Sequence, residues 1–232
     1  VVSANVRYAH DEDGLKRILS SDFFRNFPFL IQERIQGPGV GIFLLMHDGM
    51  VLAKFAHRRI REKPPSGGVS VLCESISPPK EALDAASKIL QGLRWNGVAM
   101  VEFKVDEKEK VHKLIEVNAR FWGSLQLAVI SGVDFPYLLF RMAAREPVDV
   151  PREYRIGVKS RWELGDLDHL FLRLFKKSSE LSLPQFHLSR FHIAREFLLD
   201  FFRPSIVNEI FKRDDKGPFF HELREYIRNI YQ

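Results

Sequence analysis

Short apolar runs of strand length follow one another along the first half of the chain, and residues that favour turns separate them. Asp48–Gly49 lies between two such runs, and this dipeptide favours a two-residue hairpin turn because glycine accepts a positive φ. The charged turn at residues 107–110 joins a second pair of runs. The pattern predicts antiparallel hairpins rather than a doubly wound sheet. The strands expected are residues 27–35, 40–47, 50–60, 69–76, 97–106 and 111–118.

Apolar residues at helical spacing mark most of the remaining segments. Asp11 is a suitable N-cap for a first short helix. The other helices expected are residues 78–95, 123–131, 134–145, 161–175, 184–203 and 219–230. The chain changes character at the sequence EPVDVP, residues 146–151. We therefore predict an α+β fold in residues 1–145 and a mainly helical C-terminal extension in residues 146–232.

The composition limits the class of protein. The chain has 232 residues, of which 45% are hydrophobic and 28% charged, as is typical of a soluble globular protein. Its longest apolar runs, such as residues 39–46, are far shorter than the roughly 18–20 residues of a membrane-spanning helix, so stable membrane insertion is not expected. The single cysteine, Cys73, excludes an internal disulfide and a thiolate metal cluster, and it fits a cytoplasmic location.

The charge is mildly basic, with a net value of +5 and a pI near 9.3. Such a charge suits an anionic ligand or a nucleic acid, although an ordinary solvated surface explains it equally well. The sequence lacks the aromatic RNA-binding motif and the basic helix of nucleic-acid-binding proteins. We therefore rank a nucleic-acid-binding α+β protein as the last hypothesis and expect no nucleic-acid partner.

The stretch LIEVNARFWGS, residues 114–124, carries the clearest chemical signal. Glu116, Asn118 and Arg120 are two residues apart, so they share one face of a strand. Glu102 lies in the preceding strand, and the tight turn brings it close to Glu116 across an antiparallel pair. Two carboxylates and an amide oxygen suit Mg²⁺, and Arg120 would neutralise an anion bound to that ion. The alternatives are a solvated strand face at Glu102 and a structural salt bridge from Arg120 to either acid.

The segment GVAMVEFKVD…KLIEVNARFWGSLQLAVISGVDFP, residues 97–136, resembles the metal-binding end of ATP-grasp enzymes, in particular the carbamoyl-phosphate synthase large subunit and biotin carboxylase. The resemblance implies an ATP-grasp fold. It also implies that Glu102, Glu116 and Asn118 hold two Mg²⁺ (or Mn²⁺) ions against the phosphates of ATP. Arg120 matches an arginine that contacts the acyl-phosphate or the substrate.

The stretch FLIQERIQGPGVGIF resembles the interdomain hinge of the same family. The resemblance implies that Gln32, Glu33 and Ile35 bind the adenine; an ordinary strand–turn–strand is the alternative. The family commonly places an acid after this hinge to bind the ribose hydroxyls, whereas this chain has Pro38 and Gly39. Ribose binding is therefore expected from elsewhere, with Glu33 as a candidate.

The stretch FAHRRIREKPPSGGVSV is a basic strand end that runs into a glycine loop. In the family the equivalent region reaches the phosphates and the nucleophile, which implies catalytic roles for Arg59 and Lys63. Strand alternation places Arg59, Arg61 and Lys63 on one face. Gly67 and Gly68 could bring backbone N–H groups to an anion. A solvated basic edge that discourages strand pairing is the alternative.

Two regions add less. The family's first strand, which bears a phosphate-binding lysine, and its glycine-rich loop have no counterpart after Val1, so the chain is expected to be the later part of an ATP-grasp unit. Arg161, Trp162 and Asp166 are candidate lid or interface residues. The apolar positions of the helix at 184–203 are expected to pack against the rest of the fold, with a membrane-surface helix and a partner-binding surface as alternatives.

Together these features predict an ATP- and Mg²⁺-dependent ligase that joins a carboxylate to an amine through an acyl-phosphate, and that is inactive as this isolated chain. The alternative is a non-catalytic nucleotide-binding or assembly module of the same fold. The partners expected are a small-molecule carboxylate and an amine, and a homodimer is left open.

Overall fold

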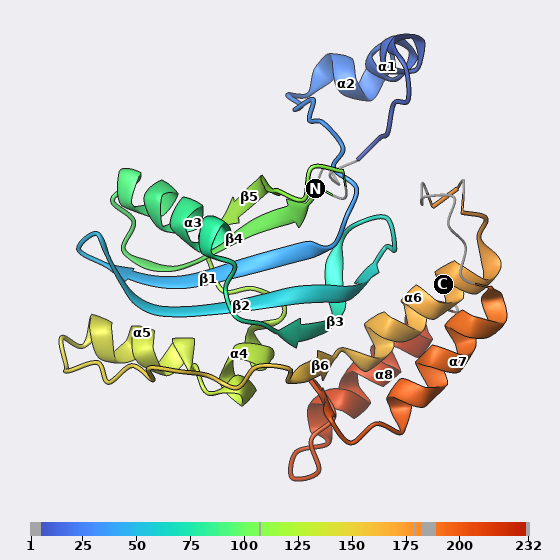
Figure 1. Cartoon of the computed structure of the whole chain (residues 1–232). Coiled ribbons are helices and arrows are strands. Elements are labelled where there is room, and N and C mark those ends of the chain that lie inside the picture. Colours follow the sequence, from blue (N-terminus) through green and yellow to red (C-terminus); the bar gives the residue numbers. More distant parts are fainter. Residues whose placement is uncertain (1–5, 107, 179, 182–188, 231–232) are drawn as a thin grey trace. The chain divides into compact units, whose positions relative to one another are not determined.

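A computed structural model describes residues 6–106, 108–178, 180–181 and 189–230 (Figure 1). The chain divides into two compact units, residues 1–34 and 35–232. The first unit contains α1 (Glu12–Leu19) and α2 (Asp22–Asn26). Asp11 is the N-cap of α1, as predicted, and its carboxylate accepts the backbone N–H of Gly14 at 2.6 Å. The guanidinium of Arg34 lies 4.4 Å from the ring centre of Tyr8.

The strand predicted at residues 27–35 is wrong, because these residues form no strand. Leu30 is 96% exposed and Ile31 is 65% exposed. A strand needs a hydrogen-bonded neighbour, and the described part of the first unit contains two helices and no strand. The apolar run has strand-like composition but lacks a partner there.

The second unit is built on one sheet with the strand order β5-β4-β1-β2-β3-β6-β7 (Figure 1). Neighbouring strands are antiparallel, except that β6 and β7 are parallel. The predicted hairpins, β1–β2 and β4–β5, are both confirmed. The short strands β6 and β7 were not predicted, since three residues are too few to show a pattern. The bounds are β1 Gly39–His47, β2 Met50–Lys63, β3 Val69–Ser75, β4 Gly97–Val105, β5 His112–Asn118, β6 Lys159–Arg161 and β7 Ile206–Asn208.

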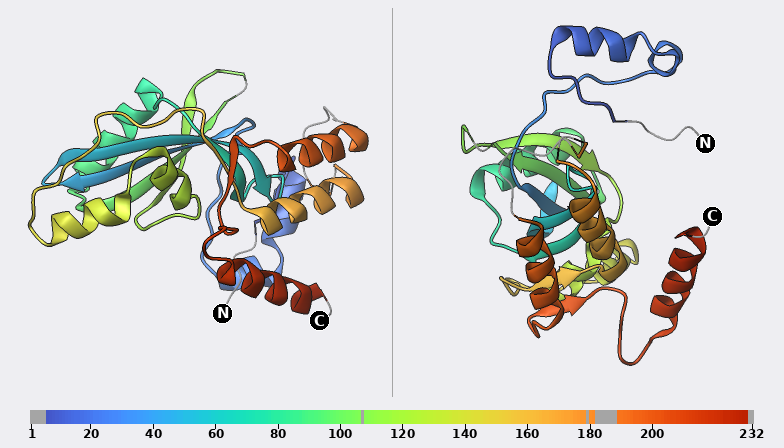
Figure 2. Two further views of the ribbon diagram at one scale, coloured as in Figure 1. Left: turned by 90° about the horizontal axis from the view of Figure 1, so that it is seen from below. Right: turned by 90° about the vertical axis from the view of Figure 1, so that its right-hand side faces the viewer.

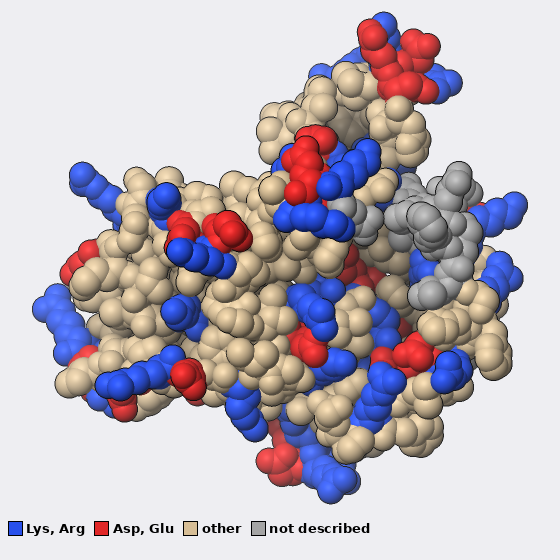
Figure 3. All heavy atoms as spheres, viewed as in Figure 1, with Lys and Arg blue, Asp and Glu red and all other residues tan. Residues whose placement is uncertain are grey.

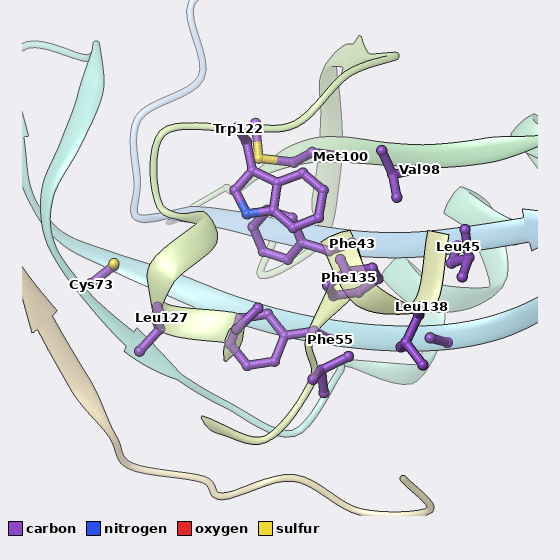
Figure 4. Close-up of a cluster of buried hydrophobic side chains, with 13 residues drawn as sticks. Phe43, Leu45, Phe55, Cys73, Val98, Met100, Trp122, Leu127, Phe135 and Leu138 are labelled. Atoms are coloured by element: carbon purple, nitrogen blue, oxygen red, sulfur yellow. The ribbon is translucent and has the colours of Figure 1, made fainter. Parts of the chain in front are cut away.

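Helices cover both faces of this sheet (Figures 1 and 2). On one face, α3 (Lys80–Gly92) packs Ala82, Ala86 and Leu90 against strands β1, β2 and β4. On the other face, α4 (Leu125–Ser131) and α5 (Phe135–Ala143) enclose a core with Phe43, Phe55, Met100 and Trp122 (Figure 4). Strand β1 is therefore buried on both sides, which explains its continuous apolar sequence.

Three further helices follow, α6 (Glu163–Phe175), α7 (Arg190–Phe201) and α8 (Gly217–Ile230). All three were predicted, although the start of the helix expected at 184–203 lies partly outside the described residues. Among the described residues, no single helix combines the length and apolarity of a membrane span; α4 and α5 together meet the test by length and composition, across a bend of 90°.

A network of buried charges joins α6 and α7 to the sheet. Arg61 on β2 donates two hydrogen bonds to Asp166 on α6, at 2.6 and 2.8 Å, and one to Asp200 on α7, at 2.6 Å. Arg161 on β6 donates to Asp166 at 2.6 Å, and its guanidinium lies 4.3 Å from the ring centre of Phe197. Asp166 and Arg161 are almost completely buried. Their charges are therefore compensated within the protein, as buried charges must be.

Replacing Asp166 by alanine is expected to destabilise the fold by about 3–5 kcal/mol, because Arg61 and Arg161 would keep buried charges without this carboxylate. Urea unfolding measures the effect. The control is Glu196→Ala, which removes an exposed partner of Arg203 and should cost less than about 1 kcal/mol. Equal effects of the two substitutions would show that the buried network does not stabilise the fold.

Glu209 directly follows β7, and its carboxylate accepts a hydrogen bond from the Ser160 hydroxyl. The pKa of Glu209 is raised from 4.5 to about 7, chiefly by burial and also by the neighbouring Glu163, while Ser160 and Lys212 oppose the shift. The folded state therefore binds a proton that the unfolded state has already lost between pH 4.5 and pH 7. Stability from this group is present below pH 4.5 and is lost as the pH rises towards 7.

Glu209→Gln should remove this pH dependence, because glutamine stays neutral. We expect the variant to exceed the wild type in stability by up to about 3 kcal/mol at pH 8 and to match it near pH 4.5. Urea unfolding at both pH values tests this, with Glu153→Gln on the exposed surface as the control. A difference that does not change with pH would contradict the shift.

Candidate active site

Two carboxylates and a histidine lie in one row across the sheet. In the strand register, Glu116 on β5 is opposite Glu102 on β4, Glu102 is opposite Gly41 on β1, and Gly41 is opposite His57 on β2. Opposite residues of antiparallel strands project from the same face. This is also the face that α4 and α5 cover, because Phe43 and Met100 are two residues away along the same strands.

Gly41 makes the middle of this row shallow, because it has no side chain, and Gly39 does the same two residues away on β1. A Cβ atom at Gly41 would lie 2.8 Å from His57 Nε2, and one at Gly39 would lie 2.9 Å from Arg59 Cδ. Side chains of β2 therefore lie directly over the backbone of β1. Arg59 crosses β1 in this way and reaches Glu102 on β4, with 2.5 Å between Nη2 and Oε2.

The structure brings the predicted metal ligands together. The Asn118 amide donates to Glu116 Oε1 at 2.7 Å and to Glu102 Oε1 at 3.3 Å. A 180° turn of this amide about χ2 would present its oxygen to the same place. Three oxygen-bearing side chains thus meet at the ends of β4 and β5. Their role as metal ligands stays a prediction.

Arg59 is the cation that neutralises the buried acid. Besides Glu102 it contacts Glu62 at 2.9 Å and donates to the carbonyl of Gly68 at 2.8 Å. Burial raises the pKa of Glu102 and Glu116 adds to the rise, while the Arg59 charge opposes it. Burial disfavours the charge of Arg59, but Glu102 and Glu62 more than offset this, so the pKa of Arg59 is raised overall. The arginine therefore stays charged.

Arg120 lies beyond the acids, on the loop after β5. Its guanidinium donates to the backbone carbonyl of Phe121 at 2.9 Å and to Asn118 Oδ1 at 3.3 Å. Within the described residues no carboxylate lies within 4 Å of it, so the salt bridge considered as its structural alternative does not form. The side chain is exposed to solvent.

The expectation that Arg59, Arg61 and Lys63 share a face is wrong. The β2–β3 register shifts on both sides of Arg61, which marks a bulge that interrupts the alternation. Arg61 consequently points to α6 and α7, and Lys63 binds Asp168 on α6 while lying 5.4 Å from the Trp162 ring centre. The bulge leaves Arg59 at the acids. The catalytic role of Lys63 is untested and stays a prediction.

Two side chains near the acids were not among the predicted site residues. Glu62 was missed because regular alternation would place it on the opposite face from Arg59. The bulge that changes this has no signal in the sequence. Lys104 lies two residues after Glu102 and opposite Gly39, so alternation alone could have identified it. Its ammonium group donates to the Gly37 carbonyl at 3.4 Å and lies 3.9 Å from the Cβ position of Gly67.

The predicted adenine-binding residues lie at the boundary of the two units. Gln32 and Glu33 belong to the first unit, in a segment without helix or strand. Ile35 is the first residue of the second unit and is buried. Adenine binding by these residues stays a prediction.

The donor set limits what metal could bind. Among the described residues, no group of three or more His, Cys, Asp and Glu side chains is arranged to hold a metal ion. Glu102, Glu116 and Asn118 offer two carboxylates and one amide. Mg²⁺ commonly binds one or two carboxylates and takes its other ligands from phosphate and water. The residues therefore fit Mg²⁺ bound together with a phosphate chain, and not a cage made by the protein alone.

A family model described as "ATP-grasp in the biosynthetic pathway with Ter operon" matches residues 25–164, more than half of the chain. The chain belongs to this ATP-grasp family. The predicted family and the predicted α+β ATP-grasp fold are thus confirmed. ATP-grasp proteins are typically ATP-dependent ligases, and membership implies ATP binding. No curated protein matches the chain significantly.

Solved structures of carboxylases are similar to this ATP-grasp chain. The biotin carboxylase of Campylobacter jejuni in its β-γ-ATP complex has a TM-score of 0.45 at 16% identity, over 55% of this chain and 30% of that chain. Rhizobium etli pyruvate carboxylase T882A with acetyl coenzyme A has a TM-score of 0.47 at 17% identity, over 57% and 14%. The biotin carboxylase domain of a thermophilic 2-oxoglutarate carboxylase bound to bicarbonate has a TM-score of 0.44 at 20% identity, over 55% and 30%.

Gly41→Ala tests the close approach of β2 side chains to β1. The new methyl would lie 2.7 Å from Phe43 Cζ and 2.8 Å from His57 Nε2, and both rings are buried. We expect a loss of about 1–3 kcal/mol in urea unfolding. Gly92→Ala is the control, because Gly92 is helical and a Cβ there meets nothing within 4 Å. A Gly41 variant as stable as this control would show that the rings can move.

Proposed function

We propose that this chain supplies the metal- and phosphate-binding part of an ATP-dependent ligase that joins a carboxylate to an amine. One observation carries the proposal: a cationic row lies next to the acidic row on the sheet. Lys104 on β4 is opposite Gly39 on β1, two residues from the pair of Glu102 and Gly41, and the Arg59 side chain of β2 lies over Gly39, with its Cδ 2.9 Å from the Cβ position there. Such neighbouring rows suit a metal ion and the polyphosphate that it binds.

In this proposal Glu102, Glu116 and Asn118 would hold Mg²⁺ or Mn²⁺. When bound, the ion would spread the charge of the transferred phosphoryl group. Arg59 is anchored by Glu62 and the Gly68 carbonyl, so its guanidinium stays beside the acids without depending on Glu102 alone. Charge-assisted hydrogen bonds from Arg59 and Lys104 would then position phosphate oxygens.

The reaction proposed has two displacements. A carboxylate oxygen of the substrate attacks the γ-phosphorus, and the bond to the leaving ADP oxygen breaks. The nitrogen of the amine then attacks the acyl carbon, the bond from that carbon to the phosphate oxygen breaks, the nitrogen gives a proton to the departing phosphate, and an amide bond forms. The exposed guanidinium of Arg120 would hold the transferred phosphate, first as the γ-phosphate of ATP and then on the acyl-phosphate. Phosphoryl transfer depends mainly on such positioning and charge stabilisation.

The substrates proposed are small molecules. On the face viewed in Figure 3, basic and acidic side chains of the second unit are interspersed. A nucleic acid would favour a continuous basic stripe. The carboxylate and the amine would approach at the exposed end of β5, where Arg120 lies.

A non-catalytic nucleotide-binding module is the second candidate, and one contact favours it. The 2.5 Å ion pair between Arg59 and Glu102 already compensates the buried acid. A cation supplied by the protein would keep Glu102 and Glu116 together without metal, as a purely structural arrangement requires.

Glu102→Gln and Glu116→Gln in the full-length protein separate these candidates. Each substitution keeps the shape of the side chain but removes a charge, so Mg²⁺-dependent ADP formation should fall on the order of 100-fold or more. The assay presents a panel of carboxylates and amines. Glu109→Gln is the matched control. Glu109 lies in the exposed turn after β4, where it pairs with Lys113 of β5.

Normal turnover by both acid variants would refute the assignment of the site. ATP binding by the wild type without turnover, for every carboxylate and amine in the panel, would support the non-catalytic module.

A further inference from the structure

Ser124 occupies the N-cap position of α4 but does not cap the helix. Serine at this position usually accepts a hydrogen bond from the first turn of the helix and so stabilises it. Here the hydroxyl lies 3.2 Å from His57 Nδ1 on β2, and both side chains are buried. The hydroxyl thus connects the start of α4 to the sheet.

His57 has an unusual environment for a histidine. It is only 1% exposed, its ring meets Phe43 edge-on at 4.8 Å, and its Nε2 atom has no hydrogen-bond partner among the described residues. Burial and the nearby Arg59 lower its pKa to about 3, so the ring is neutral. A buried unpaired nitrogen destabilises the fold, and a phenylalanine would avoid that cost. What histidine adds here is the contact of Nδ1 with Ser124.

The loop between β5 and α4 is held at both of its ends. At one end Asn118 bonds to the two acids. At the other end Ser124 contacts His57, and the buried ring of Trp122 stacks on Phe43 at 4.3 Å (Figure 4). Arg120 lies between these anchors, and its hydrogen bonds go to Phe121 and Asn118, close by in sequence. The position of Arg120 therefore depends on the anchors of the loop.

We propose that His57 and Ser124 form a latch that positions Arg120 beside the acid pair for a phosphate-bearing ligand. The latch rests on the proposed function, which gives Arg120 that ligand. His57 is a positioning residue in this arrangement, because it acts through Ser124 and the loop. The 119–124 loop and the histidine come from distant parts of the chain, and the shallow row at Gly41 lets the ring lie where Ser124 can meet it.

Ser124→Ala tests the latch in the full-length protein. It removes the hydroxyl without removing a cap, because the structure has no side-chain cap there. Calorimetry with Mg²⁺ and AMPPNP, a non-hydrolysable ATP analogue, measures the effect, and urea unfolding measures stability in parallel. We expect about 10-fold weaker binding for Ser124→Ala and for Arg120→Ala. The double variant should bind no more weakly than Arg120→Ala alone, because both changes remove the same contact.

Three further variants separate positioning from general packing. Ser131→Ala removes another buried hydroxyl of α4, one without a hydrogen-bond partner in the described part of the chain, and should bind AMPPNP like the wild type. Ser124→Thr keeps the hydroxyl and should restore binding. His57→Phe fills the ring site without a nitrogen, so it removes the unpaired Nε2 but also the contact of the Ser124 hydroxyl; it should still fold and should bind about 10-fold more weakly.

The outcomes that would overturn the latch are specific. Wild-type binding by His57→Phe or by a folded Ser124→Ala, while Arg120→Ala binds weakly, refutes the latch and leaves the proposed function in place. Additive losses in the double variant refute it as well, because the two residues then act separately. Equal binding by the wild type and Arg120→Ala contradicts the role of Arg120 in the proposed function, and the latch with it.

Discussion

The missing side chains at Gly39 and Gly41 are the constraint on which the site depends. Strand β1 lies between β2 and β4, and a side chain at either of these two positions would separate the charges of its neighbours. Without one, Arg59 spans two strand spacings and pairs with Glu102. The charged side chains of two non-adjacent strands therefore share one surface, while the other face of β1 stays apolar and packs on α3.

This arrangement sets the electrostatic balance of the acids. Glu102 is buried and faces Glu116, and each of these effects raises its pKa. Burial and a neighbouring carboxylate both disfavour the charged form of Glu102, so this form needs a nearby cation. Arg59 is that cation, and it is itself anchored by Glu62. In the proposed function, a metal ion and a phosphate chain would together replace the ion pair between Arg59 and Glu102. The metal would compensate the acids, and the phosphate would compensate the arginine.

The sequence was informative where structure is local and regular. The turn at residues 107–110 predicted the β4–β5 hairpin and so brought Glu102 near Glu116 and Asn118. The pairing of Glu102 with Glu116 itself depends on a register shift between Glu102 and Phe103, because the regular register would pair Glu102 with Ile115. The predicted strand at 27–35 failed, since pairing needs a partner that composition does not reveal. Strands β6 and β7, the contacts of Glu62 and the Arg61–Asp166 network depend on residues far apart in the sequence or on an irregular register, which no local pattern encodes.

The bulge in β2 shows how one irregularity divides similar residues between different tasks. Regular alternation would place Arg59 and Arg61 on the same face, where two guanidinium groups would compete for the same acids. The shifted register instead gives Arg59 to Glu102 and Arg61 to Asp166 and Asp200. The strand that carries the site's cation is thereby tied, two residues later, to α6 and α7 through buried ion pairs. A displacement of these helices would strain β2 at the bulge, so the framework that holds Arg59 extends from the glycine-lined row to the helices that follow the sheet.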